Sequence, residues 1–510
     1  MGKHNKAIIN IICSLLVLAT NITIGFWMSP FIVEHIGVEA NGFVSLANNF
    51  FVYACIVTMA LNSMAARFIT IEYVRKNYNQ ANLYYNSVFW GNLLIVALLL
   101  LPAVYCIVRL ETFINIPCDI LLDVKLLFFF IFFNFFINTG FPNWECGTYI
   151  TNRLDRDYIP NMFTTIFRYI IIISMMILLT PKVWYVGFAA SIAAILLLVV
   201  RRYNTHKLTP HLKIYFSKQD RLFSWDAVKE LVGAGMWNSI STVGHILLTS
   251  LDLLICNYYL GATAMGVVAL SKFIPSCIEQ LSLSVRNAFG AELTINYANG
   301  DTNTLFRDLS RAMKMTALIM LTPIACVVIF GEPFFALWVP TQDARLLQIL
   351  SFLAIFAYMF TSGTQILYNV FSTVNRVKTN SIVVVVSGIF SILLTITLIK
   401  YTNIGIYAVA GISTIVTLLR NMLFTLPMTA IYLGFNWKQF YPQVIRTILV
   451  SVILIIIGFC VKPYVKTDTW SDLFISVILY SIISMIVSLF FLLNKSERLM
   501  LFHRIVTSNN

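Results

Sequence analysis

The chain has 510 residues, of which 59% are hydrophobic and 11% are charged, so it lacks the polar side chains that would cover the surface of a soluble protein. Its mean hydropathy of +0.82 also places it among membrane proteins. The formal net charge of +13 does not indicate nucleic-acid binding, because the basic residues follow the loops on one side of a membrane. We therefore expect an integral membrane protein with no nucleic-acid partner.

Apolar segments of about 20 residues, the length that a helix needs to cross a hydrocarbon core, recur along the whole chain. We expect fourteen such spans. The first half supplies spans at 8–31, 42–66, 84–108, 121–143, 160–180 and 183–200. The second half supplies spans at 231–256, 262–285, 313–331, 346–372, 380–399 and 404–432, and two more follow at 444–461 and 473–493.

The chain contains an internal duplication. The segment IGVEANGFVSL at 36–46 returns as LGATAMGVVAL at 260–270, and the same offset of 224 residues aligns 70–73 with 294–297. Repeated sets of membrane spans are typical of carriers that alternate access. The predicted fold is all-α, with two six-helix bundles related by the repeat. The predicted divisions are 1–200 for the first bundle, 201–229 for a linker, 230–435 for the second bundle, and 436–510 for two extra helices and a tail.

Basic residues predict the orientation. With the N-terminus in the cytoplasm, most of the 35 Lys and Arg fall in inward loops and span ends, as the positive-inside rule requires. Both termini are then cytoplasmic, and we expect no cleaved targeting segment. The linker at 201–229 is strongly basic, which fits either a clamp on anionic lipid headgroups or a loop that only sets topology.

Cysteines and histidines indicate no metal site. The nine cysteines contain no CxxC pair and the six histidines have no ligand spacing, so the cysteines are expected to act as small apolar fillers. The chain has no GxxxxGK[ST] loop, which argues against ATP hydrolysis. No cofactor is expected apart from a coupling ion, H⁺ or Na⁺.

Candidate functional residues are the ionisable groups placed at membrane depth, where charge is costly. In the eighth expected span, Lys272, Glu279 and Arg286 are spaced seven apart and would project from nearly one helix face. Their counterparts in the first half include Asn48 and Asn62, which could offer neutral hydrogen bonds. The face is interpreted either as part of a cavity for an anionic group or as a buried structural network.

The seventh expected span carries a second polar stripe, in which Asn238, His245 and Asp252 are again seven apart. His245 could titrate in proton coupling because its ordinary pKa is close to physiological pH, but a hydrogen-bonded packing role is favoured. Asp252 could balance Lys272 or take a cation.

Further candidates lie in other spans. Arg67 stands at the inward end of the second span, where its side chain could simply snorkel, and Arg168 lies about two turns inside the fifth. Amide and aromatic side chains of the fourth and tenth spans, Tyr358 and Tyr368 among them, would suit a hydroxyl-rich sugar but are also expected in aromatic belts.

Several motifs resemble those of one transporter superfamily. The repeated turn reads Gly37-x-x-Ala40-x-Gly42 and Gly261-x-x-Ala264-x-Gly266, and the aspartate of LTSLDLLICNYYLGATAMGVVALSKFIP and the sequence SMAARF accompany it. With the twin six-span halves, they resemble bacterial polysaccharide and O-antigen flippases, which are lipid-linked oligosaccharide transporters. These belong to the multidrug/oligosaccharidyl-lipid/polysaccharide exporter superfamily, together with drug extruders and the lipid II flippase.

The resemblance implies a V-shaped pair of bundles around a cationic cavity. It implies transport of an undecaprenyl-diphosphate-linked oligosaccharide between leaflets of the bacterial inner membrane, for surface polysaccharide or lipopolysaccharide biosynthesis. Matching positions are Asp252, Lys272 and Arg67. The last two spans resemble the extra pair of the lipid II flippase, but the uncharged first span departs from it, so lipid II itself is less expected as cargo. Expected partners are the lipid-linked glycan, membrane lipids and polysaccharide polymerase machinery, with the carrier working as a monomer.

Three other function classes stay open. A non-transporting membrane scaffold is one of them, but it would leave the charges at membrane depth without a purpose. A cation-coupled multidrug extruder would have the same architecture but a more acidic and aromatic cavity. A membrane glycan polymerase or ligase would need catalytic groups on a sizeable outward loop, and the outward loops of this chain are short.

Overall fold

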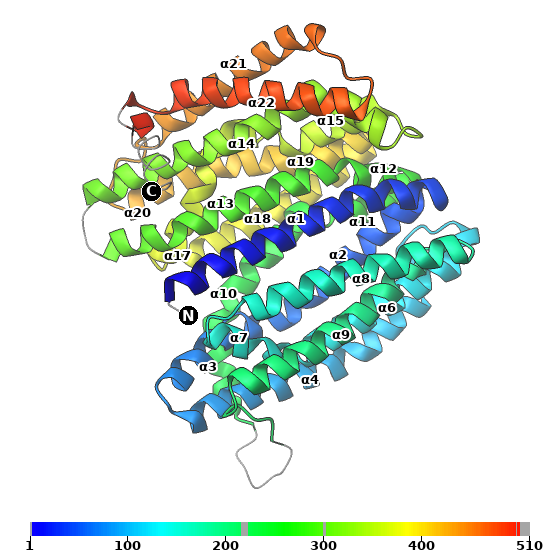
Figure 1. Cartoon of the computed structure of the whole chain (residues 1–510), viewed down its shortest axis with the longest axis vertical. Helices are drawn as coiled ribbons and strands as arrows, with labels where there is room; N and C mark the ends of the chain where they lie inside the picture. The colour runs from blue at the N-terminus through cyan, green and yellow to red at the C-terminus, as the bar shows by residue number, and fades with distance from the viewer. Residues whose placement is uncertain (1–2, 216–222, 299–301, 496, 500–510) are drawn as a thin grey trace. The chain divides into compact units, whose positions relative to one another are not determined.

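In the computed structural model, which describes residues 3–215, 223–298, 302–495 and 497–499, every regular element of these residues is helical (Figure 1). The first nine helices are α1 (Lys3–His35), α2 (Val38–Asn62), α3 (Ala65–Val74), α4 (Tyr78–Val108), α5 (Leu110–Phe113), α6 (Leu121–Gly140), α7 (Cys146–Ile150), α8 (Asp155–Leu178) and α9 (Trp184–Leu208). The next six are α10 (Trp225–Thr249), α11 (Asp252–Leu260), α12 (Ala262–Ser271), α13 (Phe273–Ala298), α14 (Thr302–Trp338) and α15 (Ala344–Ile355). The last seven are α16 (Tyr358–Thr361), α17 (Tyr368–Thr373), α18 (Val377–Tyr401), α19 (Ile406–Arg420), α20 (Leu426–Tyr432), α21 (Tyr441–Val461) and α22 (Trp470–Leu492).

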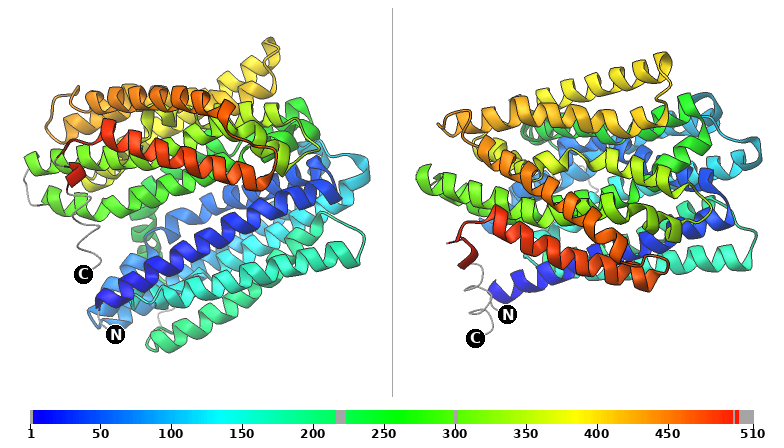
Figure 2. Two further views of the ribbon diagram at one scale, coloured as in Figure 1. Left: turned by 45° about the horizontal axis from the view of Figure 1, so that its top comes forward. Right: turned by 90° about the horizontal axis from the view of Figure 1, so that it is seen from above.

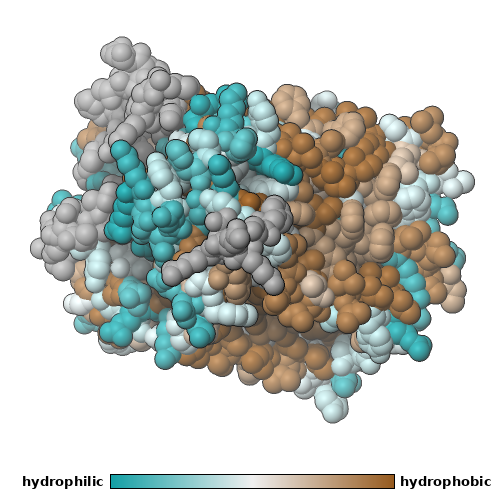
Figure 3. All heavy atoms as spheres, turned by 90° about the horizontal axis from the view of Figure 1, so that it is seen from below, coloured by the Kyte–Doolittle hydropathy of each residue, from teal (hydrophilic) through white to brown (hydrophobic). Residues whose placement is uncertain are grey.

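The predicted all-α membrane fold is confirmed. Within the described residues, thirteen helices are long and apolar enough to cross a membrane, and the number rises to fourteen if the bent pair of α12 and α13 is one span. Hydrophobic side chains cover a broad part of the outer surface in Figure 3, as helices that face lipid require.

By packing, the chain divides into two compact units. The first unit contains Met1–Ile246 and Leu253–Gly266, and the second contains Leu247–Asp252 and Val267–Asn510. Helix α9 continues to Leu208, so the first eight residues of the expected linker are helical. The sequence-based boundaries at 200, 229 and 435 stay predictions, because compact packing units and repeat boundaries are different divisions of the chain.

The duplication is visible in the backbone. Gly37 and Gly261 have positive φ angles of 121° and 92°, a region that glycine enters without steric cost. A helix begins at the next residue in each copy. The first residue of α4, Tyr78, corresponds under the same 224-residue offset to Thr302, which is helical in α14.

The two repeated turns also contact each other inside the first unit. Thr263 donates a hydrogen bond of 2.7 Å to Glu39, the residue at its own repeat position. A Cβ atom on Gly42 would lie 2.9 Å from the Cα atom of its repeat mate Gly266, and one on Gly266 would lie 2.3 Å from the carbonyl oxygen of Val38. Contacts between equivalent positions are those that a local twofold axis produces. The backbones approach so closely that only glycine fits at positions 42 and 266.

In the second unit, α14 is the central helix and carries the two extra helices. Helices α21 and α22 lie beside each other and contact α14 (Figures 1 and 2). The buried Tyr480 of α22 donates a 2.8 Å hydrogen bond to the Leu454 carbonyl oxygen of α21. Lys314 of α14 forms a 2.8 Å ion pair with Glu497, which follows α22. The extra pair is therefore part of the second unit's core.

The chain that follows α9 is fixed to α4 by two buried asparagines. Asn82 donates to the His211 carbonyl oxygen and accepts from the Lys213 amide, both at 2.8 Å. Asn86 donates to the Lys213 carbonyl oxygen at 2.9 Å and accepts from the Tyr215 amide at 2.8 Å. Each asparagine side chain therefore donates one hydrogen bond to the backbone of residues 211–215 and accepts another from it. The start of the basic linker is a docked segment of the first unit.

Replacing Asn82 and Asn86 by Ala removes these four bonds, each worth about 1 kcal/mol. We expect the Lys213 and Tyr215 amides to exchange hydrogen at least about tenfold faster in mass-spectrometric measurements. Asn79→Ala, at an exposed position of the same helix, is the control and should leave the exchange rates unchanged. Unchanged exchange in the double variant would contradict the docking role.

Candidate functional site

Lys272 and Asp252 form an ion pair at two helix interruptions of the second unit. Lys272 lies between α12 and α13, which are bent by 43°, and Asp252 begins α11 after a turn at 250–251. The Lys272 Nζ atom is 2.9 Å from Asp252 Oδ2 and 3.0 Å from the Thr249 carbonyl oxygen. The side chains are 25% and 11% exposed, so each charge depends on the other for compensation.

Pro275 explains the interruption at Lys272. A proline at this position has no amide hydrogen for the Ser271 carbonyl oxygen and crowds it. The buried Ser351 hydroxyl of α15 donates a 2.6 Å hydrogen bond to that oxygen instead. The broken helix is therefore stabilised by a side chain of the same unit.

In each predicted seven-residue stripe, two of the three residues share one helix and the third lies beyond an interruption: Asn238 and His245 share α10, and Glu279 and Arg286 share α13. The bend at Lys272 separates this residue from Glu279 and Arg286, which share α13. The turn at 250–251 separates Asp252 from His245, which has an exposed side chain on α10. Glu279 is half-buried and interacts electrostatically with Lys272 and Arg286, so the structure still groups these three charges.

A second cluster of the second unit surrounds Tyr368. The guanidinium carbons of Arg286 and Arg420 each lie 5.7 Å from the centroid of the Tyr368 ring, within the range of cation–π attraction. Arg420 Nη2 donates to the Tyr368 hydroxyl oxygen at 3.0 Å, and that hydroxyl donates to Asn421 Oδ1 at 2.6 Å. Asn369 donates to the Arg286 carbonyl oxygen at 2.8 Å, which connects α17 with α13.

This cluster lies where two spans depart from regular α-helix. A 3-10 helix, Gly363–Leu367, ends just before Tyr368, and a π-helix, Asn421–Thr425, begins just after Arg420. The Tyr441 hydroxyl donates to the Met422 carbonyl oxygen at 2.7 Å, so the π-helix is supported from α21. Irregular backbone at membrane depth is tolerated where protein groups satisfy it, and π-helical turns are frequent at functional sites.

Sequence reasoning did not select Arg420 as a site residue. The sequence feature that could have identified it is its position as a single cation about midway along the apolar span Ile406–Tyr432. In the structure the residue is only 8% exposed. Its connection to Tyr368 and Arg286 joins three spans that are far apart in sequence.

The predicted residues of the first unit do not form a comparable cluster in the described structure. Asn48 on α2 and Arg67 on α3 have exposed side chains. Arg168 on α8 stacks on the neighbouring Tyr169, with its guanidinium carbon 4.9 Å from the ring centroid. The Asn62 amide is engaged with Asn92 through reciprocal bonds of 3.0 and 2.8 Å, which gives it a packing role between α2 and α4.

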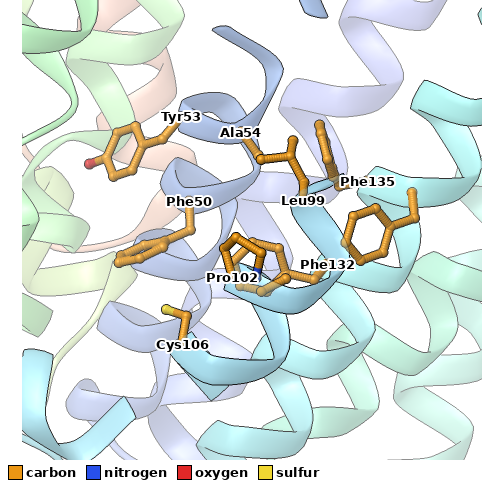
Figure 4. A pocket seen from close by; sticks show the side chains of 10 residues that line it. Phe50, Tyr53, Ala54, Leu99, Pro102, Cys106, Phe132 and Phe135 are labelled. Atoms are coloured by element: carbon orange, nitrogen blue, oxygen red, sulfur yellow. The ribbon is translucent and has the colours of Figure 1, made fainter. Parts of the chain in front are cut away.

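An apolar pocket opens within the first unit between α2, α4 and α6 (Figure 4). Its volume is about 300 Å³. Its walls consist of Phe50, Tyr53, Ala54, Leu99, Pro102, Ala103, Cys106, Phe132, Phe135 and Phe136. Such a lining suits a hydrocarbon chain or an aromatic molecule and offers little to a sugar or phosphate.

Breaking the Asp252–Lys272 pair should destabilise the protein. We expect Lys272→Met to lower the free energy of unfolding by about 3 kcal/mol, because it leaves Asp252 without its cation, and the double variant with Asp252→Leu to recover most of the loss. Thermal unfolding of the detergent-solubilised protein measures both. The control is Lys125→Met, which breaks the more exposed Lys125–Glu111 pair and should change little. A double variant no more stable than Lys272→Met would contradict this account.

Comparison with known proteins supports the fold. No family model matches the sequence. The chain is 28% identical over 506 residues to the "Uncharacterized membrane protein EpsK" of Bacillus subtilis (strain 168), covering 98% of both chains.

Solved structures match at lower identity. The lipid II flippase MurJ, in an inward closed conformation, has a TM-score of 0.66 at 14% identity and covers 94% of this chain and 98% of its own. An inward-facing MATE multidrug transporter of the MOP superfamily has a TM-score of 0.59 at 14% identity, covering 84% and 98%. The MATE multidrug transporter DinF-BH, solved as a complex, has a TM-score of 0.56 at 16% identity, covering 86% and 96%. The chain is therefore a multi-pass membrane protein with the fold shared by MurJ and the MATE transporters.

Proposed function

We propose that this protein is a flippase that moves an undecaprenyl-diphosphate-linked oligosaccharide between membrane leaflets by alternating access. The observation that carries the proposal is an excess of cations at membrane depth in the second unit. Among the described residues, no carboxylate lies within 4.0 Å of Arg286 or Arg420. Cationic groups are expensive in lipid, and an anionic cargo would compensate them.

The comparisons support the same class of transporter. MurJ, whose name describes a lipid II flippase, covers 94% of this chain, whereas the two MATE structures above cover 84% and 86%. The difference is about 40 to 50 residues of this chain, which is the length of two spans. An extra pair like α21 and α22 thus favours the flippase branch of the fold over the extruder branch.

In the proposed mechanism, the diphosphate first meets exposed or half-buried cations near the cytoplasmic side. Arg67 is the exposed group at the inward end of its span, and Arg286 lies on α13. Arg168 and Lys272 are further candidates, although Lys272 is already compensated by Asp252. The glycan would use neutral groups such as Asn48, while the lipid tail remains in the bilayer against the apolar outer surface.

Energy for transport would come from a coupling ion, H⁺ or Na⁺. The carboxylates of Glu279 and Asp252 are the proposed carriers, with His245 as a further candidate for a proton. We place the protein in the bacterial inner membrane as a monomer, with cytoplasmic termini and a role in surface polysaccharide biosynthesis such as O-antigen assembly. Polysaccharide polymerase machinery would use the translocated product.

A cation-coupled multidrug extruder is the second candidate. It is favoured by the apolar pocket lined with phenylalanines (Figure 4) and by the similarity to MATE structures that are described as multidrug transporters. It would use Glu279 and Asp252 as acidic groups for a cationic drug, but it leaves Arg286 and Arg420 without a role.

A strain that lacks the gene tests the two functions against each other. A flippase predicts loss of surface glycan and accumulation of lipid-linked oligosaccharide in the cytoplasmic leaflet, both reversed by the intact gene. Unchanged glycan together with new drug sensitivity would refute the flippase and support the extruder.

Alanine at both Lys272 and Arg286 should reduce glycan transport at least about tenfold, since charge-assisted bonds to phosphate are each worth about 1.5–3 kcal/mol. The measurement is restoration of surface glycan in the deletion strain, with membrane insertion checked by immunoblotting. Lys125→Met, which breaks the more exposed Lys125–Glu111 pair outside the proposed path, is the control and should restore surface glycan fully. Full restoration by the Lys272/Arg286 variant would argue against a charged transport path.

A further inference from the structure

Three hydrogen-bond donors buried in the second unit have no acceptor among the residues that the structure describes. They are Arg420 Nε, Arg420 Nη1 and Asn421 Nδ2. Arg420 is 8% exposed and Asn421 is fully buried. Buried polar groups are nearly always paired, and each unpaired donor carries a desolvation cost, which is largest for a charged group. Such an arrangement persists when the donors have another use.

The surrounding bonds hold these donors in a fixed arrangement. Tyr368 accepts from Arg420 Nη2 at 3.0 Å and donates to Asn421 Oδ1 at 2.6 Å. Thr425 also donates to Asn421 Oδ1, at 3.1 Å. The carbonyl side of the Asn421 amide is therefore occupied twice, and its NH₂ group stays available. Groups that are already oriented lose little entropy when they bind a ligand.

The local charge is positive. The guanidinium carbons of Arg286 and Arg420 both lie 5.7 Å from the centroid of the Tyr368 ring. The half-buried Tyr358 interacts electrostatically with both arginines and with Glu279. Glu279 is the single carboxylate among these groups and lies beyond 4.0 Å from either guanidinium. Two cations with one distant anion are under-compensated in a low-dielectric setting.

We propose that Arg420, Asn421 and Arg286 form an oxyanion site within the second unit that binds a phosphate group of the transported lipid. Nε and Nη1 lie on different edges of the planar guanidinium, and Asn421 Nδ2 is a third donor, so the ligand needs several acceptor oxygens. A phosphate or diphosphate has them, and a halide does not. This inference rests on the proposed function, since the diphosphate carrier supplies the anion. Free phosphate or an anionic phospholipid headgroup would offer the same chemistry.

The site predicts an unusual combination of effects for Arg420→Gln. Without ligand, the variant should unfold at a higher temperature than the native protein, because an under-compensated buried charge has been removed. With undecaprenyl diphosphate, it should bind about 10- to 100-fold more weakly. If Arg420 had only a structural role, Arg420→Gln would instead unfold at a lower temperature than the native protein without ligand.

The measurement is thermal unfolding of the full chain in phosphatidylcholine nanodiscs, titrated with undecaprenyl diphosphate, since a ligand that binds the folded state raises the unfolding temperature. Arg376→Gln is the matched control. The Arg376 guanidinium carbon lies 5.7 Å from the Tyr432 ring centroid, but its side chain is exposed. This variant should retain native affinity. Arg420→Lys keeps the charge but loses the fork of donors, and it should bind more weakly than the native protein.

Two further titrations identify the source of the phosphate. Inorganic diphosphate tests free anions, and nanodiscs that contain phosphatidylglycerol test phospholipid headgroups. Arg420-dependent stabilisation by undecaprenyl diphosphate at concentrations where the other two have no effect supports the proposal. Equal stabilisation by phosphatidylglycerol would overturn the assignment to the transported lipid, and native affinity in Arg420→Gln would overturn the site.

The proposed function and the site can fail separately. If the deletion strain keeps its glycan while Arg420-dependent binding is observed, the flippase is wrong and the phosphate site stands. If the deletion strain loses its glycan but Arg420→Gln restores it and binds undecaprenyl diphosphate normally, the flippase stands and the site is wrong.

Discussion

The cost of placing charge away from water governs the arrangement of the second unit. Lys272 meets this cost with a carboxylate 2.9 Å away and a backbone carbonyl oxygen 3.0 Å away, so its charge is compensated within the protein. Arg420 has only a tyrosine hydroxyl and the face of its ring. The two sites therefore differ in kind. The first is compensated internally, and the second leaves donors that a ligand can use.

Helix interruptions determine where those charges lie. The bend at Lys272 follows from Pro275, and the carbonyl oxygen that the proline leaves unpaired is taken by Ser351. Near Arg420, a π-helix is held by the hydroxyl of Tyr441. In each case a hydroxyl from another helix compensates the irregular backbone. These supports allow non-helical geometry at membrane depth, which is where carriers commonly form their binding sites.

The sequence predicted the features that lipid itself imposes. Apolar length located the spans, and the duplication located the turns at Gly37 and Gly261, where both glycines adopt positive φ angles. Seven-residue spacing held within α10 and within α13 but not across the interruptions at 250–251 and Lys272, because it assumes an unbroken helix. Pro275 was a visible signal of the break that was not used. The partners of Arg420 could not be predicted from one sequence, since Tyr368 and Arg286 come from other spans and meet only through tertiary packing.

The two repeats have diverged in charge and in the continuity of their helices. Position 272 is lysine in the second half and Asn48 at the equivalent place in the first. The second half breaks its helix there, whereas the first continues through to Asn62 before the interruption that precedes α3. The turns meanwhile remain similar enough for Glu39 to bond to its own counterpart, Thr263. In the proposed carrier, conformational movement would need contact surfaces that match, and cargo binding would need charges that are concentrated in one place. In this chain the repeated turns retain the matching contact, and the helices that follow them carry the asymmetry in charge.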